Sequence, residues 1–234
     1  MEGYPAMNLV EYPDREMMMI DVANQLAGQI NEALMTHDRV TFAVPGGTTP
    51  GPVFDVLCAA QLDWANVLVL PTDERWVPLS SDASNARLIR RHLLTGHAAK
   101  AGFLSLYMDG KEPEEAAPEL DAQLAGRLPI SVLLLGMGAD MHTASLFPGA
   151  AGLMAAMHRH AGGPVFAPIK VPGSGPEGTR MTLTAPVLED ALSKHVLITG
   201  AGKRRALDEA RRLDDPLLAP ICAVLDGATV HWAE

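Results

Sequence analysis

Residues 132–149 read VLLLGMGADMHTASLFPG, and this stretch decides how the chain folds. It opens with an apolar run that stops at glycines, and a polar segment with Asp140, His142, Thr143 and Ser145 follows. A buried strand that ends in a polar loop is how open parallel α/β sheets build binding sites. Histidine is the side chain whose ordinary pKa suits proton transfer near neutral pH. A capped turn with a hydrogen-bonded histidine explains the same residues, so both interpretations stay open at this point.

Strand and helix patterns alternate on both sides of this stretch. Strand patterns lie at 40–44, 67–70, 130–135, 165–169, 180–184, 195–199 and 229–232. Helix patterns lie at 17–34, where Asp14 is a candidate cap, and at 53–60, 85–94, 113–128 and 203–213. This alternation predicts an α/β fold whose mostly parallel sheet has helices on both faces. No linker or repeat is visible, so residues 1–234 are predicted to form a single domain.

Composition limits the classes of function. The chain has 234 residues, 48% of them hydrophobic, and a formal net charge of −10. The acidic balance argues against a broad nucleic-acid surface, although a local cluster of cations can still bind a phosphorylated ligand. No apolar run approaches the roughly 18 residues that span a membrane. The acidic segment 2–16 has no basic leader, which predicts that there is no signal peptide.

The two cysteines are predicted to be buried structural thiols. Cys58 and Cys222 lie in apolar surroundings and lack the spacing of a metal site. Free thiols of this kind are typical of a protein in a reducing compartment.

Three segments at strand ends offer groups that suit a phosphate. The run Pro45-Gly46-Gly47-Thr48-Thr49-Pro50 combines glycines, which allow close backbone approach, with hydroxyl donors. Arg180 begins a strand pattern, and Lys203 follows a glycine turn at the start of a helix pattern. An arginine can bind a phosphate with two parallel hydrogen bonds. Each segment also has an alternative interpretation: a plain turn at 45–50, a solvated side chain at Arg180 and a basic helix face at Lys203.

A fourth segment, Thr72-Asp73-Glu74-Arg75-Trp76, follows the buried strand 67–70. Its two carboxylates and its guanidinium can position hydroxyls and an anionic group, or they can form a surface ion pair. The nearby pair Ser84-Asn85 is either functional or a helix cap. Because parallel strands end at one edge of a sheet, we expect all five loops to converge on one cleft.

Taken in order, these segments resemble the 6-phosphogluconolactonase family over nearly the whole chain. The resemblance rests on Val44–Pro50, Asp73–Pro78, Ser84-Asn85, Leu135–Gly149, Arg180–Thr184 and Gly200–Lys203. It implies a modified Rossmann-like fold and cytoplasmic hydrolysis of 6-phospho-D-glucono-1,5-lactone in the oxidative pentose phosphate pathway. It also implies that no metal or organic cofactor takes part.

The chain departs from the family pattern at two places near the expected site. Met141 stands where the family usually has glycine, and a methionine is costly there if the backbone needs a positive φ. Pro45 and Thr48 stand where the family often has serine. Thr48 keeps the hydroxyl, whereas Pro45 removes a backbone N–H donor.

Lactone hydrolysis needs an attacking water, a base and donors for the oxyanion. We expect His142 to be the base, with Asp140 or Asp73 orienting it or a sugar hydroxyl. Arg75 is expected to stabilise charge on the carbonyl oxygen or to hold a hydroxyl. The phosphate is expected to bind the backbone of Gly46 to Thr49, with Arg180 and Lys203 as cationic partners. Because no Gly-x-Ser-x-Gly motif is present, we do not expect a serine nucleophile.

Two other functions are compatible with the same loops. A glucosamine-6-phosphate deaminase/isomerase shares the phosphate loop, but that family has a Glu where this chain has Phe147. A sugar-phosphate-binding module without catalysis would need an output segment such as a DNA-binding helix-turn-helix, and no basic one fits here. The substrate predicted is a small phosphosugar, with no nucleic-acid or membrane partner, and the sequence does not indicate an oligomeric state.

Overall fold

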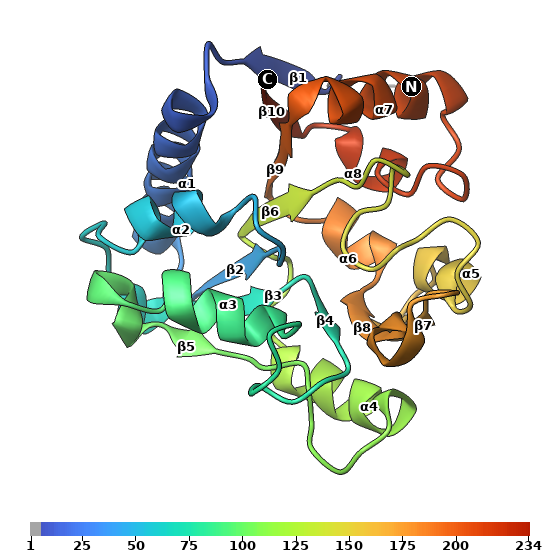
Figure 1. Cartoon of the computed structure of the whole chain (residues 1–234). Coiled ribbons are helices and arrows are strands. Elements are labelled where there is room, and N and C mark those ends of the chain that lie inside the picture. The colour runs from blue at the N-terminus through green and yellow to red at the C-terminus, as the bar shows by residue number, and fades with distance from the viewer. Residues whose placement is uncertain (1–5) are drawn as a thin grey trace.

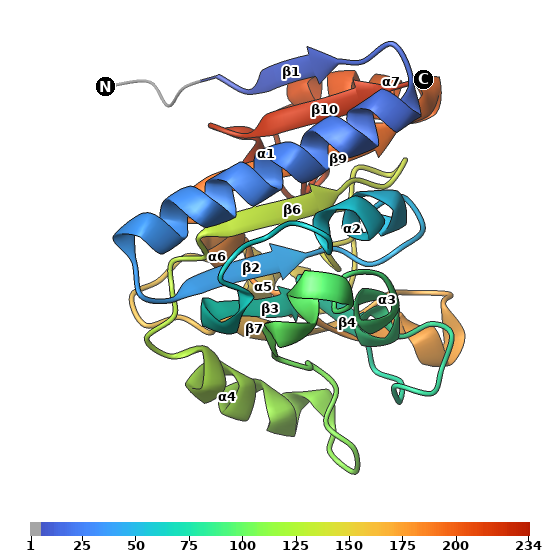
Figure 2. The same ribbon diagram turned by 90° about the vertical axis from the view of Figure 1, so that its left-hand side faces the viewer.

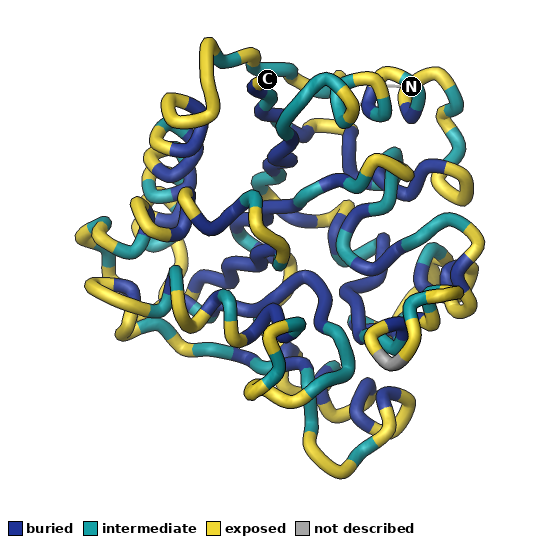
Figure 3. Tube along the Cα trace, viewed as in Figure 1, coloured by how far each residue is buried: buried dark blue, intermediate teal, exposed yellow. Residues whose placement is uncertain are grey.

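The computed structural model describes residues 6–234, apart from the side chain of Pro176. Its centre is a seven-stranded sheet in the order β1-β10-β9-β6-β2-β3-β5, and every neighbouring pair is parallel (Figure 1). The strands are β1 (Asn8–Glu11), β2 (Val40–Val44), β3 (Val67–Pro71), β5 (Gly102–Phe103), β6 (Val132–Gly136), β9 (Ser193–Thr199) and β10 (Thr229–Ala233). The central strands are buried (Figure 3), as expected for a parallel sheet that is covered on both faces.

Helices cover both faces of this sheet, as predicted. The helices are α1 (Arg15–Thr36), α2 (Gly51–Leu57), α3 (Asn85–His92), α4 (Pro113–Leu124), α5 (Leu153–Met157), α6 (Ala185–Glu189), α7 (Gly200–Leu213) and α8 (Cys222–Leu225), with 3-10 turns η1 (Trp64–Asn66), η2 (Gly96–Lys100) and η3 (Gly175–Gly178). One core cluster joins α1, α2 and α3 to the sheet, and Figure 2 views the molecule from that side. The other cluster joins α4, α7 and the short helices to the opposite face.

A second, three-stranded sheet was not predicted. Two of the expected strands, observed as β7 (Phe166–Lys170) and β8 (Thr179–Leu183), form an antiparallel hairpin instead of extending the main sheet. The third strand, β4 (Asp73–Arg75), pairs with β8, although we expected a loop there. Its three residues are charged and give no apolar signal, although Asp73 and Glu74 are buried, so only the pairing with β8 identifies the strand. The small sheet places β4 and β8 beside the ends of β2 and β3.

Several boundaries also differ from the prediction. The expected helix 113–128 ends at Leu124, and the helix expected from Lys203 already begins at Gly200. Asp14 caps α1 as predicted, because its Oδ1 accepts from the Met17 amide at 2.8 Å. Strand β1, which pairs with β10, lies in a segment for which we predicted no element.

Cys58 and Cys222 are free thiols and are partly rather than fully buried. Residues 1–5, which belong to the segment used to predict the lack of a signal peptide, lie outside the described residues. Within residues 6–234, no helix is both long and apolar enough to cross a membrane.

The order of the strands creates a crevice between β2 and β6. The helix that follows β2 packs on the α1 side of the sheet, whereas the chain after β6 packs on the opposite side. Such a switch point, at the carboxyl ends of the strands, is where open α/β sheets bind ligands. The fold therefore places the segment after Gly136 next to the loop after Val44.

Candidate active site

A cleft of about 270 Å³ lies at this switch point and contains nearly all the residues predicted from the sequence. Its lining includes Gly46, Gly47, Thr48, Thr49, Asp73, Arg75, His142, Arg180 and Lys203. Asn85 and Ala144 also line it, and apolar walls come from Leu135, Met137 and Leu197. The fold therefore brings the five predicted loops together. Among the predicted residues, Asp140 is not part of the lining, and its side chain is exposed.

His142 is held by a hydrogen bond to Asp140. Its Nδ1 lies 2.5 Å from Asp140 Oδ1, and the His142 amide also donates to that oxygen, at 3.4 Å. A carboxylate that accepts from Nδ1–H leaves Nε2 as the basic nitrogen of the neutral ring. Gly138 makes room for this pair, since a Cβ there would lie 2.2 Å from His142 Nδ1 and 2.4 Å from Asp140 Oδ1. The site thus has an oriented histidine at its wall.

The loop that holds His142 is strained in backbone conformation. Met141 has φ 66° and Ala144 has φ 49°, in the left-handed region that costs a non-glycine residue about 1–2 kcal/mol. The positive φ that makes a methionine costly is therefore present. Two backbone hydrogen bonds hold Met141, whose N–H donates to Gly138 O at 3.1 Å and whose carbonyl accepts from Ile221 N at 3.1 Å. Its partly buried side chain also packs against the core.

Asp73 has a different set of partners from Asp140. Its Oδ2 accepts from Ser145 Oγ at 2.5 Å, and its Oδ1 accepts from Thr72 Oγ1 at 3.1 Å. Ser145 is itself fixed, because its amide donates to Thr182 Oγ1 at 3.2 Å. The structure thus separates the two carboxylates: Asp140 orients His142, and the buried Asp73 is held against the base of the cleft.

Asn85 connects three parts of the cleft. Its Oδ1 accepts from Arg75 Nη1 at 2.6 Å, and its Nδ2 donates to the Asp73 carbonyl at 2.7 Å. A Cβ on Gly46 would lie 1.9 Å from Asn85 Oδ1, so only glycine fits at that point of the loop. Arg75 Nη1 also donates to Ala83 O at 3.2 Å. The Asn85 side-chain amide therefore holds the Arg75 guanidinium and lies against Gly46 of the glycine-rich segment 45–50.

Glu74 fixes the amino end of α3, on which Asn85 lies. This fully buried carboxylate accepts from the amides of Arg75, Asn85 and Ala86 at 2.9, 2.7 and 2.7 Å, and from Ser84 Oγ at 3.2 Å. Burial raises the pKa of Glu74 to about 7, although these hydrogen bonds oppose the shift. The position of Asn85 therefore depends on a carboxylate that does not line the cleft.

Three cations line the cleft, and two of them are neighbours. Arg75 and Arg180 are cross-strand partners in the β4–β8 pair, where like charges repel and an anion between them is favourable. Burial lowers the pKa of Arg180 and of Lys203, yet both remain protonated near neutral pH because their ordinary values are high. Asp73 is the acidic residue of this lining, so the three cations give the cleft a net positive charge. The chain as a whole has a net charge of −10.

The glycine loop and the start of α7 face each other across one end of the cleft. Gly47 has φ 83°, which glycine adopts at no steric cost. Thr199 precedes α7 without capping it through its side chain, so the first amides of this 14-residue helix are open to an acceptor. Trp232 Nε1 donates to Gly200 O at 3.2 Å and holds this turn. With Lys203 in the first turn of α7, this end suits an anion.

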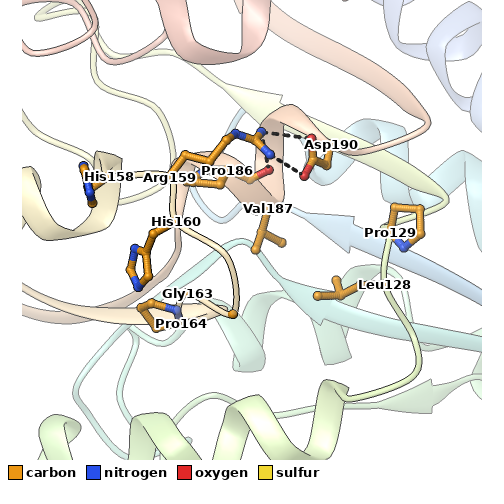
Figure 4. A pocket seen from close by; sticks show the side chains of 11 residues that line it. Leu128, Pro129, His158, Arg159, His160, Gly163, Pro164, Pro186, Val187 and Asp190 are labelled. Atoms are coloured by element: carbon orange, nitrogen blue, oxygen red, sulfur yellow. Dashed lines mark hydrogen bonds and ion pairs between the residues drawn. The ribbon is translucent and has the colours of Figure 1, made fainter.

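A larger cavity, of about 610 Å³, lies elsewhere and shares none of the predicted residues. Figure 4 shows its lining, which includes His158, His160 and Arg159. The guanidinium of Arg159 is bound by Asp190, at 2.9 Å to each carboxylate oxygen, and by Glu189 at 2.8 Å. The charge of Arg159 is therefore already neutralised by these two carboxylates. Among residues 6–234, no group of three His, Cys, Asp or Glu side chains could hold a metal ion.

Sequence reasoning did not identify some residues that shape the site. The roles of Ser145 and Gly138 depend on contacts that no spacing rule reveals. Phe147 was considered only for the carboxylate it replaces. The structure stacks its ring on His142, with centroids 3.9 Å apart and planes at 21°. Asn85 was identified as a candidate, although its link to Arg75 could not be foreseen.

Comparison with known proteins agrees with this geometry. A family model described as glucosamine-6-phosphate isomerases/6-phosphogluconolactonase matches residues 13–232. A 6-phosphogluconolactonase from Caulobacter vibrioides is 39% identical and aligns over 99% of each chain. One from Pseudomonas aeruginosa is 41% identical over 90% of this chain and 88% of its own. The crystal structure of a 6-phosphogluconolactonase from Shewanella baltica superposes with a TM-score of 0.92 at 29% identity, covering 99% of this chain and 100% of that one.

Proposed function

Because the chain belongs to the 6-phosphogluconolactonase family, within the glucosamine-6-phosphate isomerase/6-phosphogluconolactonase superfamily, we propose that the cleft between β2 and β6 hydrolyses 6-phospho-D-glucono-1,5-lactone to 6-phospho-D-gluconate. The reaction opens a cyclic ester with water, in the oxidative pentose phosphate pathway. The observation that supports this proposal most directly is the Asp140–His142 pair at the wall of a positively charged cleft.

His142 is the general base of this mechanism. Its Nε2 takes a proton from a water molecule as that water attacks the lactone carbonyl. Asp140, bound to Nδ1, keeps the ring in the tautomer that can accept the proton, and it stabilises the imidazolium that forms. When the tetrahedral intermediate collapses, the imidazolium returns the proton to the ring oxygen that leaves. The products are then an alcohol and a carboxylic acid, which releases its proton to solvent and becomes the carboxylate, and the neutral base is ready for a second cycle.

Arg75 stabilises the negative charge that develops on the carbonyl oxygen. It is suited to this task because Asn85 and the Ala83 carbonyl hold its guanidinium before substrate binds, so little reorganisation is needed. Asp73 is held by Ser145 and accepts a hydrogen bond from a sugar hydroxyl. This division of roles follows from the separate partners of the two carboxylates.

The phosphate binds at the other end of the cleft. The backbone of the loop from Gly46 to Thr49 and the two threonine hydroxyls donate to it, and Lys203 at the start of α7 supplies charge. Arg180 completes the set from β8. A phosphate fixed at this end places the lactone ring between Lys203 and His142.

The test is to measure acid release after adding freshly prepared 6-phosphogluconolactone, corrected for spontaneous hydrolysis. We expect His142→Ala to lower kcat by about 10²–10⁴-fold with little change in KM, as is typical for loss of a positioned base. A near wild-type kcat in the folded variant would show that His142 is not the base. Release of ammonia from glucosamine 6-phosphate would assign the chain to the deaminase branch, and phosphosugar binding without turnover would indicate a sensing module.

The proposal includes a cytoplasmic location. Both cysteines are free thiols, as is usual in a reducing compartment, and the substrate is a charged sugar phosphate.

A further inference from the structure

Phe147 contacts two side chains that line the proposed active site. Its ring stacks on His142 with a centroid distance of 3.9 Å, and the Cζ of Arg180 lies over the same ring, 5.1 Å from its centroid. His142 and Arg180 both line the cleft, one in the loop after β6 and the other on β8. One aromatic side chain therefore contacts both the histidine and a cation of the site.

The chain fixes Phe147 before any ligand binds. Leu146, its neighbour, is fully buried, and the Leu146 amide donates to Thr143 O at 2.9 Å. This turn folds the segment back, so that residues 142 and 147 meet. The Phe147 carbonyl accepts from Ala150 N at 3.1 Å, and the half-buried ring packs against the larger core cluster. The ring is thus anchored to the core cluster while it contacts both polar side chains.

Neither polar side chain is fully held by its other contacts. The hydrogen bond from Nδ1 to Asp140 restrains one edge of the His142 ring, but the Asp140 side chain is itself more than half exposed, so this contact alone holds the ring loosely. A ring stacked on the face of the imidazole restrains its tilt and therefore the direction of Nε2. Arg180 has one further anchor, from its Nε to Glu177 O at 3.2 Å, and it faces the like charge of Arg75 across β4–β8. The face of the Phe147 ring attracts the Arg180 guanidinium electrostatically and so supports it.

We propose that Phe147 is a positioning residue that holds the His142 imidazole and the Arg180 guanidinium in one stack, and so fixes the base relative to a substrate-binding cation. The inference rests on the proposed function for its kinetic consequences, but the stack itself does not. Loss of the ring should disturb the base and the cation together, because both are supported by the same side chain. A small displacement of a base can lower its rate contribution by as much as about a hundredfold.

The test compares Phe147→Leu, which keeps apolar volume but removes the ring, with Phe147→Tyr, which keeps the ring. We expect Phe147→Leu to lower kcat about tenfold or more and to raise KM about threefold or more, and Phe147→Tyr to stay close to wild type. The matched control is Phe103→Leu on β5, which removes a ring under Arg90 at a similar distance, 4.9 Å, outside the cleft. We expect this control to keep wild-type kcat and KM.

The second readout is the NMR signal of the His142 ring, identified by its loss in His142→Gln. A stacked aromatic ring shifts imidazole protons upfield, and we expect that shift in wild type and in Phe147→Tyr, but not in Phe147→Leu. Wild-type kcat and KM in folded Phe147→Leu, or a His142 signal that does not respond to it, would overturn the proposal. If the wild-type protein hydrolysed no lactone, the proposed function would fail, while the NMR comparison would still decide whether the stack exists.

Discussion

Asp140 Oδ1 lies 2.5 Å from Nδ1 of His142, while Asp140 itself stays outside the lining of the cleft. The carboxylate can therefore affect the reaction through the histidine without touching the substrate. We expect Asp140→Asn to lower kcat about a hundredfold and to change KM less than about threefold, because the amide can still bind Nδ1–H but cannot stabilise an imidazolium. Steady-state kinetics with the phosphorylated lactone measure both constants.

The control for this prediction is a second Asp–His pair. Asp55 Oδ1 lies 2.8 Å from His92 Nδ1, away from the cleft, so Asp55→Asn removes the same kind of contact. We expect it to leave kcat unchanged. Equal kcat values for Asp140→Asn and wild type would remove Asp140 from the mechanism.

Gly138 offers a steric test of the same pair. A methyl group at this position would overlap His142 Nδ1 and Asp140 Oδ1, at 2.2 and 2.4 Å, so the two side chains must separate. We expect Gly138→Ala to lower kcat about tenfold or more through a misplaced base. The control is Gly28→Ala on α1, where nothing lies within 4 Å and alanine favours the helix. A fully active Gly138→Ala variant would mean that the pair is not needed in the observed geometry.

The main sheet could be predicted from the sequence because its signal is local. Parallel strands buried on both faces read as apolar runs, so 40–44 and 67–70 were recognised close to their true bounds. Strand β4 could not be recognised, because its residues are charged and only the distant partner β8 makes it a strand. For the same reason, the sequence could not show that 165–169 and 180–184 leave the main sheet. Non-local pairing decided each of these cases.

The candidate site, too, could be predicted only in part from the sequence. The residues that line the cleft could be predicted, since strand ends in a parallel sheet meet at one edge. Which partner each residue has could not, because it depends on distances of a few ångströms. Asp140 and Asp73 were interchangeable as candidates until the structure assigned one to His142 and the other to Ser145. The cost of Met141 was foreseen only conditionally, since its φ of 66° is a property of the folded loop.

Lys203 provides a test of where the phosphate binds. We expect Lys203→Ala to raise KM for the phosphorylated lactone about tenfold, because a charged hydrogen bond to the phosphate is lost, with little effect on kcat. Hydrolysis of glucono-1,5-lactone, which has no phosphate, should not respond. Arg211→Ala, a charge removal near the other end of α7, is the control and should affect neither substrate. An equal loss on both lactones would contradict a phosphate role for Lys203.

Away from the cleft, two buried histidines link β9 and β10 to α1. His195 Nδ1 lies 2.8 Å from His231 Nε2, and the chain of hydrogen bonds continues from His231 to Tyr12 at 2.9 Å and from His195 to Gln29 at 2.7 Å. Burial lowers the pKa of each histidine to about 4, and for His231 the neighbouring His195 adds to the effect. Both rings are therefore neutral in the folded protein at pH values where an unfolded histidine is protonated.

The direction in which stability changes with pH follows from how many protons the folded and unfolded states bind. Between about pH 6.5 and pH 4, these two histidines are protonated in the unfolded chain but neutral in the folded protein. The free energy of unfolding therefore falls as the pH falls, by about 1.4 kcal/mol per pH unit for each histidine. Glu74 acts in the opposite direction, because its raised pKa of about 7 lets the folded state hold a proton that the unfolded chain releases above about pH 4.5. Two histidines outweigh one carboxylate, which leaves a net loss of stability toward acid.

Urea unfolding between pH 4.5 and pH 6.5 measures this slope in the wild type and in a His195→Gln/His231→Gln double variant. Glutamine retains hydrogen-bonding groups but cannot titrate, so we expect the variant to lose the acid destabilisation, or to reverse its sign because Glu74 then dominates. His97→Gln at an exposed position should leave the wild-type slope unchanged. Parallel slopes for wild type and the double variant would mean that the two histidines titrate alike in the folded and unfolded states, and that their burial does not govern stability in acid.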